Sequence, residues 1–446
     1  MKKYFAAASV LLFSCSFAFA QPLATPNTFS FSLQQSLDYA MQHQPTVLNA
    51  QIDEEITLRQ AQEITALSLP QINGSVQFQD MVKLPTQLLP GEFFGAPAGT
   101  FIPVQFGTQY NTSAGITANQ LIADGQFFVA TKANKTLMEL SKKNTQRTII
   151  ETKVAVTKAY YSVLVNQKRM DLLTANVDRV KKLKDDSKVL LDNGFIEKID
   201  FDRVSVGYNN LLTEQDNVKQ LVSLTYSLLK FQMGMDVNAT LTLTDSLSED
   251  ALKADELINA TTAPQNRIEM QMLNSQKTLY QLNIKRYQMQ YLPSVYGFAS
   301  YSLNNMRPKL DFAGQWYPTG IVGLQIAVPI FDGFLKERKI QEGNLNLQKN
   351  ANDMFALQNA INLEVNSSKI NLTNNVKSLA SQKENMLLAE SVYADAKKKF
   401  DVGKESSLEV VNAETDLKTA QTNYLNALYD AWISKVDLMK ANGNIK

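Results

Sequence analysis

The stretch from Gln126 to Leu191 constrains the fold more than any other part of the chain, because it contains neither proline nor glycine. An α-helix rises about 1.5 Å per residue, so these roughly 65 residues would form a rod on the order of 100 Å long. A compact domain cannot enclose such a rod. The stretch from Phe334 to Phe400 matches it, with only Gly343 inside. The sequence therefore predicts an elongated, mainly helical protein.

The chain also repeats itself. Gly403 follows Gly194, and Gly443 follows Gly234, at one common separation of 209 residues (403 − 194 and 443 − 234). Two further motif pairs occur in the same order, namely Leu69-Pro70-Gln71 with Leu292-Pro293-Ser294, and Asp124-Gly125 with Asp332-Gly333. Self-similarity at a fixed period indicates a duplicated structural unit.

Each copy is predicted to contain a first helix, a proline-marked hairpin of two strands, a very long helix, a glycine turn and a second long helix. We expect the copies at residues 21–234 and 265–446, joined by a connector at 235–264 in which Leu241 to Thr244 forms a short strand. Because glycine is favoured just after a helix C-terminus, Gly194 and Gly403 predict that the long helices of each copy fold back as a coiled-coil hairpin.

The last helix carries a heptad repeat, which is typical of a coiled-coil seam. Its two rows are Val410, Leu417, Tyr424, Ala431 and Leu438, and Ala413, Ala420, Ala427 and Ser434. Shifted back by 209 residues, the same register falls on Phe201, Tyr208, Gln215, Val222 and Leu229, with Val204, Leu211, Val218 and Thr225.

Residues 1–20 read as an export signal. Lys2 and Lys3 form a basic start, an apolar stretch follows, and Ala18-Phe19-Ala20 is a small-residue cleavage pattern before Gln21. An alternative places a lipid anchor on Cys15 instead of cleavage before Gln21.

The composition excludes most catalytic chemistry. After cleavage no cysteine remains and His43 is the one histidine, which removes disulfides, thiolate nucleophiles, Cys/His metal sites and imidazole catalysis. We expect no enzyme, no cofactor and no metal site. Lys+Arg total 44 and Asp+Glu 43, a balance that argues against a nucleic-acid partner.

Two segments alternate with the period of a strand. The residues from Tyr110 to Asn119 and from Val322 to Val328 place apolar and polar side chains on opposite faces. Their partners, near 72–81 and 295–303, alternate less cleanly. Beyond the signal, no window has the roughly 18 consecutive apolar residues of a membrane-spanning helix, so insertion in a membrane would have to use strands.

Four strands cannot close a barrel, because single-chain bacterial barrels begin at about eight strands and an open edge in lipid leaves backbone groups unpaired. Three chains would supply a 12-stranded β-barrel, continued by a 12-helix α-barrel. The alternative is a small soluble β-sandwich that also carries the helices.

The loop from Lys83 to Gly107 is expected on the extracellular side, and Trp316 and Tyr317 suit an interfacial aromatic girdle.

Four motifs together carry a family resemblance, namely Leu33-x-x-Ser36-Leu37-x-x-Ala40 before His43-Gln44-Pro45, Tyr291-Leu292-Pro293-Ser294, Ile330-Phe331-Asp332-Gly333, and Val402-Gly403-x-x-Ser406-x-Leu408-x-Val410. In this order and spacing the chain resembles the TolC-like outer-membrane efflux proteins. The resemblance implies a homotrimer in outer-membrane lipid, a periplasmic extension, an equatorial connector, and docking to a periplasmic adapter and an inner-membrane pump. His43-Gln44-Pro45 and Arg267-Ile268-Glu269 depart from the family's usual Asn-Pro and Arg-Pro-acid spellings.

The resemblance also implies where function lies. Acidic residues after the glycine turns ring the periplasmic opening in the family, which points to Glu409, to Asn412 where the family has a second acid, and to Asp200 in the first copy. Ser406 to Glu409 also spells a helix-capping box, which is compatible with a pore-facing acid. The exposed turns, with Gly194, Phe195, Gly403, Lys404 and Glu405, are the expected adapter contacts.

The predicted function is a passive exit duct gated at the helix tips. The main rival is a periplasmic coiled-coil adapter, which normally carries one helical hairpin where this chain has two. The exported cargo and the class of pump cannot be inferred from the sequence.

Overall fold

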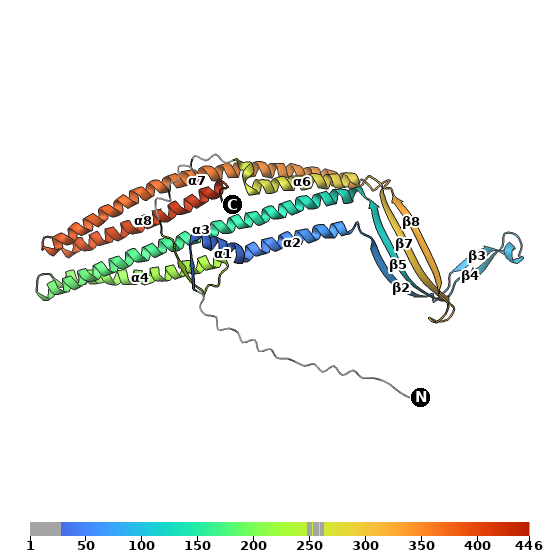
Figure 1. Ribbon diagram of the computed structural model, residues 1–446, viewed down its shortest axis with the longest axis horizontal. Coiled ribbons are helices and arrows are strands. Elements are labelled where there is room, and N and C mark those ends of the chain that lie inside the picture. The colour runs from blue at the N-terminus through green and yellow to red at the C-terminus, as the bar shows by residue number, and fades with distance from the viewer. Residues whose placement is uncertain (1–27, 248–251, 253–257, 259–262, 446) are drawn as a thin grey trace, which may run out of the picture.

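The computed structural model describes residues 28–247, 252, 258 and 263–445. The predicted signal peptide, including Cys15, lies outside the described residues. The molecule is a rod: two helical hairpins run side by side to one end, and a β-sheet closes the other (Figure 1). Short elements and the C-terminus lie midway along it.

The element order of the first half recurs in the second. The first half contains α1 (Leu33–His43), α2 (Pro45–Ala66), β2 (Gln71–Asp80), β5 (Tyr110–Ala123), α3 (Gly125–Asp192) and α4 (Lys198–Met233). The second contains α6 (Ile268–Met289), β7 (Ser294–Arg307), β8 (Tyr317–Ala327), α7 (Leu335–Asp401) and α8 (Ser407–Ala441). In the first half the proline at position 45 splits the leading helix into α1 and α2, because its ring cannot continue a helix from the preceding turn.

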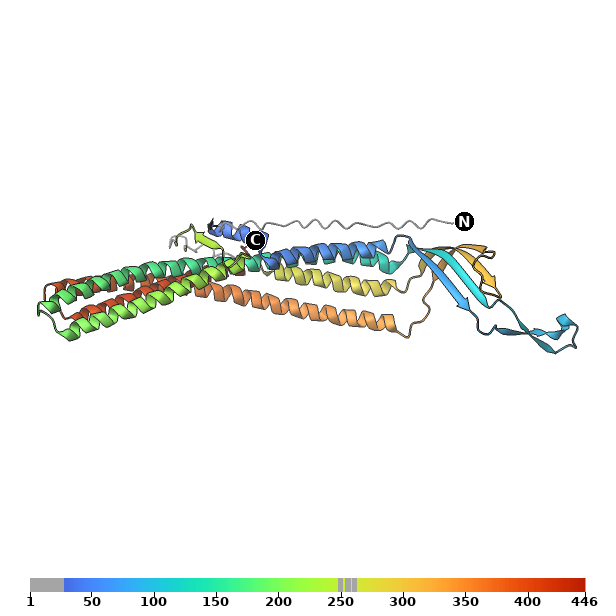
Figure 2. The ribbon, with the colours of Figure 1, turned by 90° about the horizontal axis from the view of Figure 1, so that it is seen from below.

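The two very long helices are continuous, as predicted. α3 has 68 residues and α7 has 67. Asp124 caps α3 by accepting a 3.0 Å hydrogen bond from the Phe127 amide. α3 pairs with α4 and α7 pairs with α8, and Figure 2 shows the two hairpins lying against each other over the half of the rod that ends in the turns. Of the helices in the described part of the chain, none is both long and apolar enough to cross a membrane.

The heptad register of α8 is confirmed by burial. Every predicted seam position from Val410 to Leu438 is buried except Tyr424, which is half-buried. In α4 the second row, Val204, Leu211, Val218 and Thr225, is buried, whereas the first row is half-buried until Leu229.

The four membrane-length strands form one antiparallel sheet in the order β2-β5-β7-β8. The cross-strand register sorts their side chains by face. One face carries Ile72, Val76, Phe78, Ala114, Ile116, Ala118, Ala299, Tyr301, Leu303, Val322, Leu324 and Ile326. The other carries Gln71, Asn73, Ser75, Gln77, Asn111, Ser113, Thr117, Asn119, Ser300, Ser302, Asn304, Thr319 and Gln325. The sheet therefore has a mainly apolar face and a mainly polar face. The exceptions on the polar face are Leu121, Tyr296, Phe298, Met306, Tyr317 and Ile321, and those on the apolar face are Asp80, Thr112, Asn305 and Arg307.

The segment from Lys83 to Gly107 is not a plain loop. It contains β3 (Thr86–Pro90) and β4 (Phe101–Gln105), which pair as a separate two-stranded ribbon with a 3₁₀ turn, η1 (Gly91–Phe94), at its end. The prediction of a loop was wrong here because proline and glycine, which usually mark loops, stand inside and beside short strands. Figure 1 shows the ribbon projecting beyond the sheet.

A second small sheet lies at the middle of the rod. β1 (Thr28–Phe31) pairs in parallel with β6 (Thr240–Leu243), the short strand predicted in the connector. Tyr160 of α3 donates a 2.8 Å hydrogen bond to Asp245, whose same oxygen accepts from the Leu33 amide at the start of α1. Nearby, His43 stacks on Tyr39 with ring centroids 3.9 Å apart. The described part of the connector is thus fastened to the first repeat.

Candidate functional site

The turns at the helical end of the rod are closed in the same way in both repeats. The amide of Phe195 donates to the Leu190 carbonyl at 2.9 Å, and the amide of Lys404 donates to Lys399 at 2.9 Å. Gly194 and Gly403 have φ of 74° and 72°, the left-handed region that this closure requires and that glycine adopts without a steric penalty. The predicted glycine turns are therefore correct.

The two tips are bound to each other by Asp200. Its side chain is 23% exposed and accepts a 2.6 Å hydrogen bond from the Ser407 hydroxyl in the first turn of α8. Arg203 lies 3.7 Å from the same carboxylate oxygen. Because Asp200 belongs to the α3–α4 hairpin and Ser407 to the α7–α8 hairpin, this contact ties the free ends of the hairpins together.

Glu409 and Asn412 are exposed on α8. They lie three residues apart on a helix, so they share one face near the tip. The capping box predicted for this turn is not formed: Ser406 occupies the N-cap position with ψ of 158°, but its side chain makes no capping hydrogen bond. The Glu409 side chain is therefore not committed to closing the helix end.

The outermost surface of the tips is open. Phe195 is 77% exposed, a large fraction for a phenylalanine. Lys404 is also exposed, whereas Glu405 is half-buried and pairs with Lys399 at 3.1 Å. Gly194 and Gly403 have nothing within 4 Å of the position that a Cβ would take. The predicted contact residues thus form a small accessible surface, except that Glu405 is partly engaged within its own hairpin.

A buried polar cluster lies about two to four helical turns from the tips and was not predicted. Glu414 of α8 has a side chain only 8% exposed, and its carboxylate lies 3.2 Å from Nε of Arg179 on α3. The Arg179 guanidinium sits over the Tyr393 ring of α7, 4.9 Å from its centroid. These three side chains join α3, α7 and α8 beside the apolar cluster of Leu183, Val204, Tyr393, Phe400, Val410, Ala413 and Leu417.

The electrostatics of this cluster are unusual. Burial raises the pKa of the Glu414 carboxyl from 4.5 to about 7, although Arg179 and, to a lesser degree, Lys418 oppose the shift. Burial and the nearby Glu414 raise the pKa of Tyr393 to about 12, so its hydroxyl stays neutral. No sequence signal singled out Glu414, because it follows the seam residue Ala413 at a position that is usually solvated in a two-helix coiled coil.

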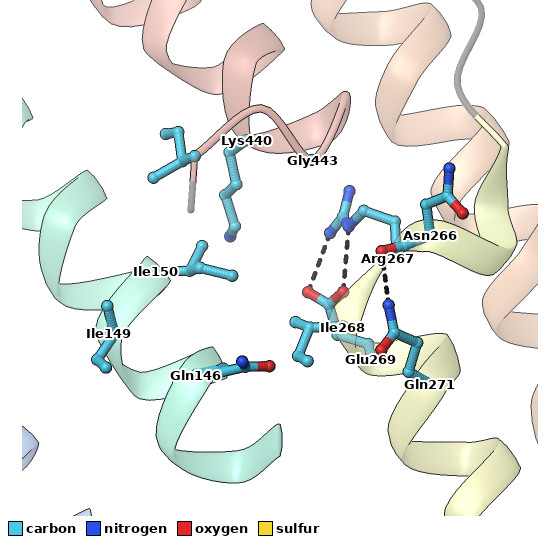
Figure 3. A pocket seen from close by; sticks show the side chains of 11 residues that line it. Gln146, Ile149, Ile150, Asn266, Arg267, Ile268, Glu269, Gln271, Lys440 and Gly443 are labelled. Carbon is cyan, nitrogen blue, oxygen red and sulfur yellow. Dashed lines mark hydrogen bonds and ion pairs between the residues drawn. The ribbon is translucent and has the colours of Figure 1, made fainter. Parts of the chain in front are cut away.

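A cavity away from the tips surrounds Arg267, at the start of α6 (Figure 3). A cavity of about 490 Å³ is bounded there by α3, by the start of α6 and by the end of the chain near Gly443. Arg267 donates to Glu269, to Glu364 at 3.1 Å and to the Ala441 carbonyl at 3.0 Å. The hydrogen bonds of Arg267 are thus used to fasten α6 to α7 and α8. Among the described residues there is no cluster of His, Cys, Asp and Glu that could hold a metal ion.

Comparisons with known proteins agree with this architecture. The family model described as "Outer membrane efflux protein" matches residues 259–444. The chain is 21% identical over 294 residues to the "Outer membrane protein TolC" of Vibrio cholerae, an alignment that covers 65% of this chain and 67% of that protein. The chain is TolC-like, with an outer membrane efflux protein domain at residues 259–444.

Solved structures share the fold. The crystal structure of the outer membrane protein VceC from Vibrio cholerae superposes with a TM-score of 0.70 at 14% identity, covering 92% of this chain and 96% of that one. CusC gives a TM-score of 0.74 at 14% identity, with 95% of each chain covered. These likenesses confirm the predicted fold of long helical hairpins, and the family model and the Vibrio cholerae relative confirm the family resemblance. This TolC-like protein is an outer-membrane efflux channel protein of the bacterial cell and not an enzyme.

Proposed function

We propose that three copies of this TolC-like chain form a passive exit duct, with a 12-stranded β-barrel in the outer membrane continued by a 12-helix α-barrel in the periplasm. The observation that carries this proposal is the two-faced sheet. Its apolar face suits lipid, with Val322 86% exposed and Val76 78% exposed, and its polar face suits a water-filled lumen. Within one copy, no other element of the described chain forms a layer over either face.

The two edges of the sheet support the closure. β2 and β8 are the outer strands, and the antiparallel pairing along β2-β5-β7-β8 makes them run in opposite directions. β8 of one copy can therefore pair with β2 of the next as another antiparallel pair. Cyclic pairing of this kind leaves no edge strand in lipid, where each unpaired backbone group costs several kcal/mol.

The duct is gated at the helix tips. In the closed packing the hairpins are held together by the Asp200–Ser407 hydrogen bond and by the apolar cluster behind it. Opening moves the α7–α8 hairpin away from the α3–α4 hairpin, and a partner that binds the separated form better shifts the population toward it. Glu409, with Asn412 on the same face, lines the narrowest part, where three copies of one acid would attract cations.

The same tips receive the partners. A periplasmic adapter contacts the exposed surface of Gly194, Phe195, Gly403, Lys404 and Glu405, and an inner-membrane pump supplies the energy. The rival role, in which this chain is itself the adapter, is disfavoured because each of its two hairpins is followed or preceded by a strand pair of membrane length, and because its relatives are outer-membrane channels.

The oligomer is tested by the mass of the purified mature protein in detergent. Native mass spectrometry should give a particle of three chains, and the same particle should run as a heat-labile trimer on a gel. A monomer that stays soluble without detergent would contradict the proposal, because such a chain would not need neighbours to complete its sheet.

Gating is tested with a cysteine pair at the tip contact. The mature chain has no cysteine of its own, so Asp200→Cys with Ser407→Cys forms one defined disulfide under oxidation. The oxidised channel should conduct little in planar bilayers, and a reductant should restore its current. Ser407→Cys alone is the matched control. Equal currents in oxidised and reduced protein would refute gating by separation of these hairpins.

A further inference from the structure

We propose that Glu414 is a proton-controlled latch between the two hairpins: its protonated form holds them together, and its ionisation lets them separate. The inference rests on the proposed gating and adds a signal that controls it. It is drawn from a carboxyl group that the mechanism above does not use.

The first step is geometric. Both carboxylate oxygens of Glu414 are buried, and within the described chain neither accepts a hydrogen bond. Arg179 lies within ion-pair distance at 3.2 Å, but its Nε makes no hydrogen bond to the carboxylate. Arg179 also donates to Asn176, and Asn176 donates to Gln421 of α8 at 2.7 Å. The arginine is therefore shared among several partners and only partly compensates the carboxylate.

The second step is to name the charges around Glu414. α3 presents Arg179 and α7 presents Tyr393, which is neutral near pH 7 because burial raises its pKa to about 12. α8 presents Lys418, one turn after Glu414, and Lys418 is already paired with Glu214 of α4. Within this cluster Glu414 is thus the described group whose charge changes near neutral pH.

The third step is the position of the cluster between moving parts. A cavity of about 190 Å³, bounded by α3, α4 and α8, lies beside Glu414 and is lined by Gly207, Asn210 and Thr415. Because residues of both hairpins enclose the carboxyl group, separation of the hairpins would expose it to water. Its pKa would then fall toward the ordinary 4.5 from the value of about 7 in the closed packing.

The direction of the effect follows from linkage. The closed form binds the proton more tightly than the open form, so the stabilisation of the closed form is complete below about pH 4.5 and is lost as the pH rises through about 7. Two to three pKa units correspond to a change on the order of 100-fold in the closed-to-open ratio of each chain. Acid conditions therefore close the channel, and neutral to alkaline conditions favour opening.

The test is the open fraction of single channels in planar bilayers between pH 5 and pH 8.5, for the native chain and for Glu414→Gln. The native open fraction should rise at least tenfold as the pH passes 7, whereas Glu414→Gln should stay as closed as the native chain at pH 5. Asp416→Asn, a matched change at an exposed position of the same helix, should keep the native pH profile. A flat native profile, or a native-like profile in Glu414→Gln, would overturn the proposal.

A second variant should shift the pH midpoint of channel opening, which would not move if Glu414 had a merely structural role. Arg179→Met removes the group that lowers the Glu414 pKa, so the midpoint of opening should move to higher pH. A midpoint that stays fixed or moves to lower pH would count against the latch.

A third measurement does not depend on conduction, so that failure of the latch is distinguished from failure of the channel. Ser187 is fully buried, and on α3 it lies four residues from Leu183 of the apolar cluster between the hairpins and three from Leu190, which packs against that cluster. Ser187→Cys should be labelled by a water-soluble maleimide only when the hairpins separate. The same rate is measured in the double variant Ser187→Cys with Glu414→Gln. The ratio of the two labelling rates removes the pH dependence of the thiol itself. This ratio should rise about tenfold or more from pH 5 to pH 8, and a constant ratio would refute the latch even if the protein conducts no current.

Discussion

Two lysine variants, one on each face of the same strand, should show which face of the sheet contacts lipid and which lines the lumen. Val76 and Gln77 are adjacent in the middle of β2, and the cross-strand register pairs Val76 with Ala114 and Gln77 with Ser113. Val76→Lys places a charge on the apolar face, and Gln77→Lys places the same charge on the polar face. Because the two variants have the same net charge and nearly the same position, they differ only in what the lysine faces.

The magnitude follows from the depth of the site. A lysine on the lipid face of a membrane barrel costs about 2–4 kcal/mol at the midplane and much less near the interfaces. Val76 lies near the centre of a 10-residue strand, so the midplane value applies to each chain. Three copies would lose about 6–12 kcal/mol in the assembled barrel, whereas Gln77→Lys should lose less than about 1 kcal/mol per chain.

The assay is refolding of the purified protein into lipid vesicles, followed by the yield of heat-labile trimer on a gel over a urea series. Val76→Lys should need a markedly lower urea concentration to prevent assembly, and Gln77→Lys should follow the native curve. If the two variants assemble equally well, or if Gln77→Lys is the more damaging, the assignment of the faces is wrong and with it the argument for a barrel.

Three further predictions concern the helices. Gly234→Ala should lower the free energy of unfolding, measured by thermal unfolding, by on the order of 3 kcal/mol, because at φ of 70° its Cβ would lie 2.5 Å from the His43 carbonyl oxygen. Gly194→Ala, at φ of 74° in open space, should lower it by only about 1 kcal/mol. Equal losses in the two variants would show that the packing beside α1 is not rigid. Phe195→Ser should weaken adapter binding at least tenfold in a pull-down titration. Val206→Ser, at a residue 59% exposed and two turns into α4, should leave adapter binding unchanged. A larger loss of binding in Val206→Ser than in Phe195→Ser would place the adapter contact along the helices. Glu409→Gln should lower the cation selectivity of single-channel currents measured in a salt gradient, and unchanged selectivity would exclude Glu409 from the constriction.

The long helices and their turns could be predicted because local sequence determines them. The absence of proline and glycine in α3 and the left-handed positions of Gly194 and Gly403 require no tertiary information. The heptad register of α8 was equally local, and burial of Val410, Ala413 and Leu417 follows it.

Other features depend on distant partners and could not be predicted. β1 pairs with β6 although Thr28 and Thr240 are more than 200 residues apart in the chain. Glu414 is buried because a second hairpin covers the side of α8 that would face water in a two-helix coiled coil. The hydrogen bond between Asp200 and Ser407 likewise joins the two repeats. Similarity between the repeats shows that they fold alike but does not show which of their residues touch.

The central claim, that chains with open-edged sheets assemble into a closed duct, is tested most directly by electrical conductance. Purified mature protein added to one side of a planar lipid bilayer should produce stepwise currents of uniform size, with one step for each inserted trimer. Protein that binds the bilayer yet never yields a discrete current step, at any pH between 5 and 8.5 and after tip contacts are removed by Asp200→Ala, would contradict the account.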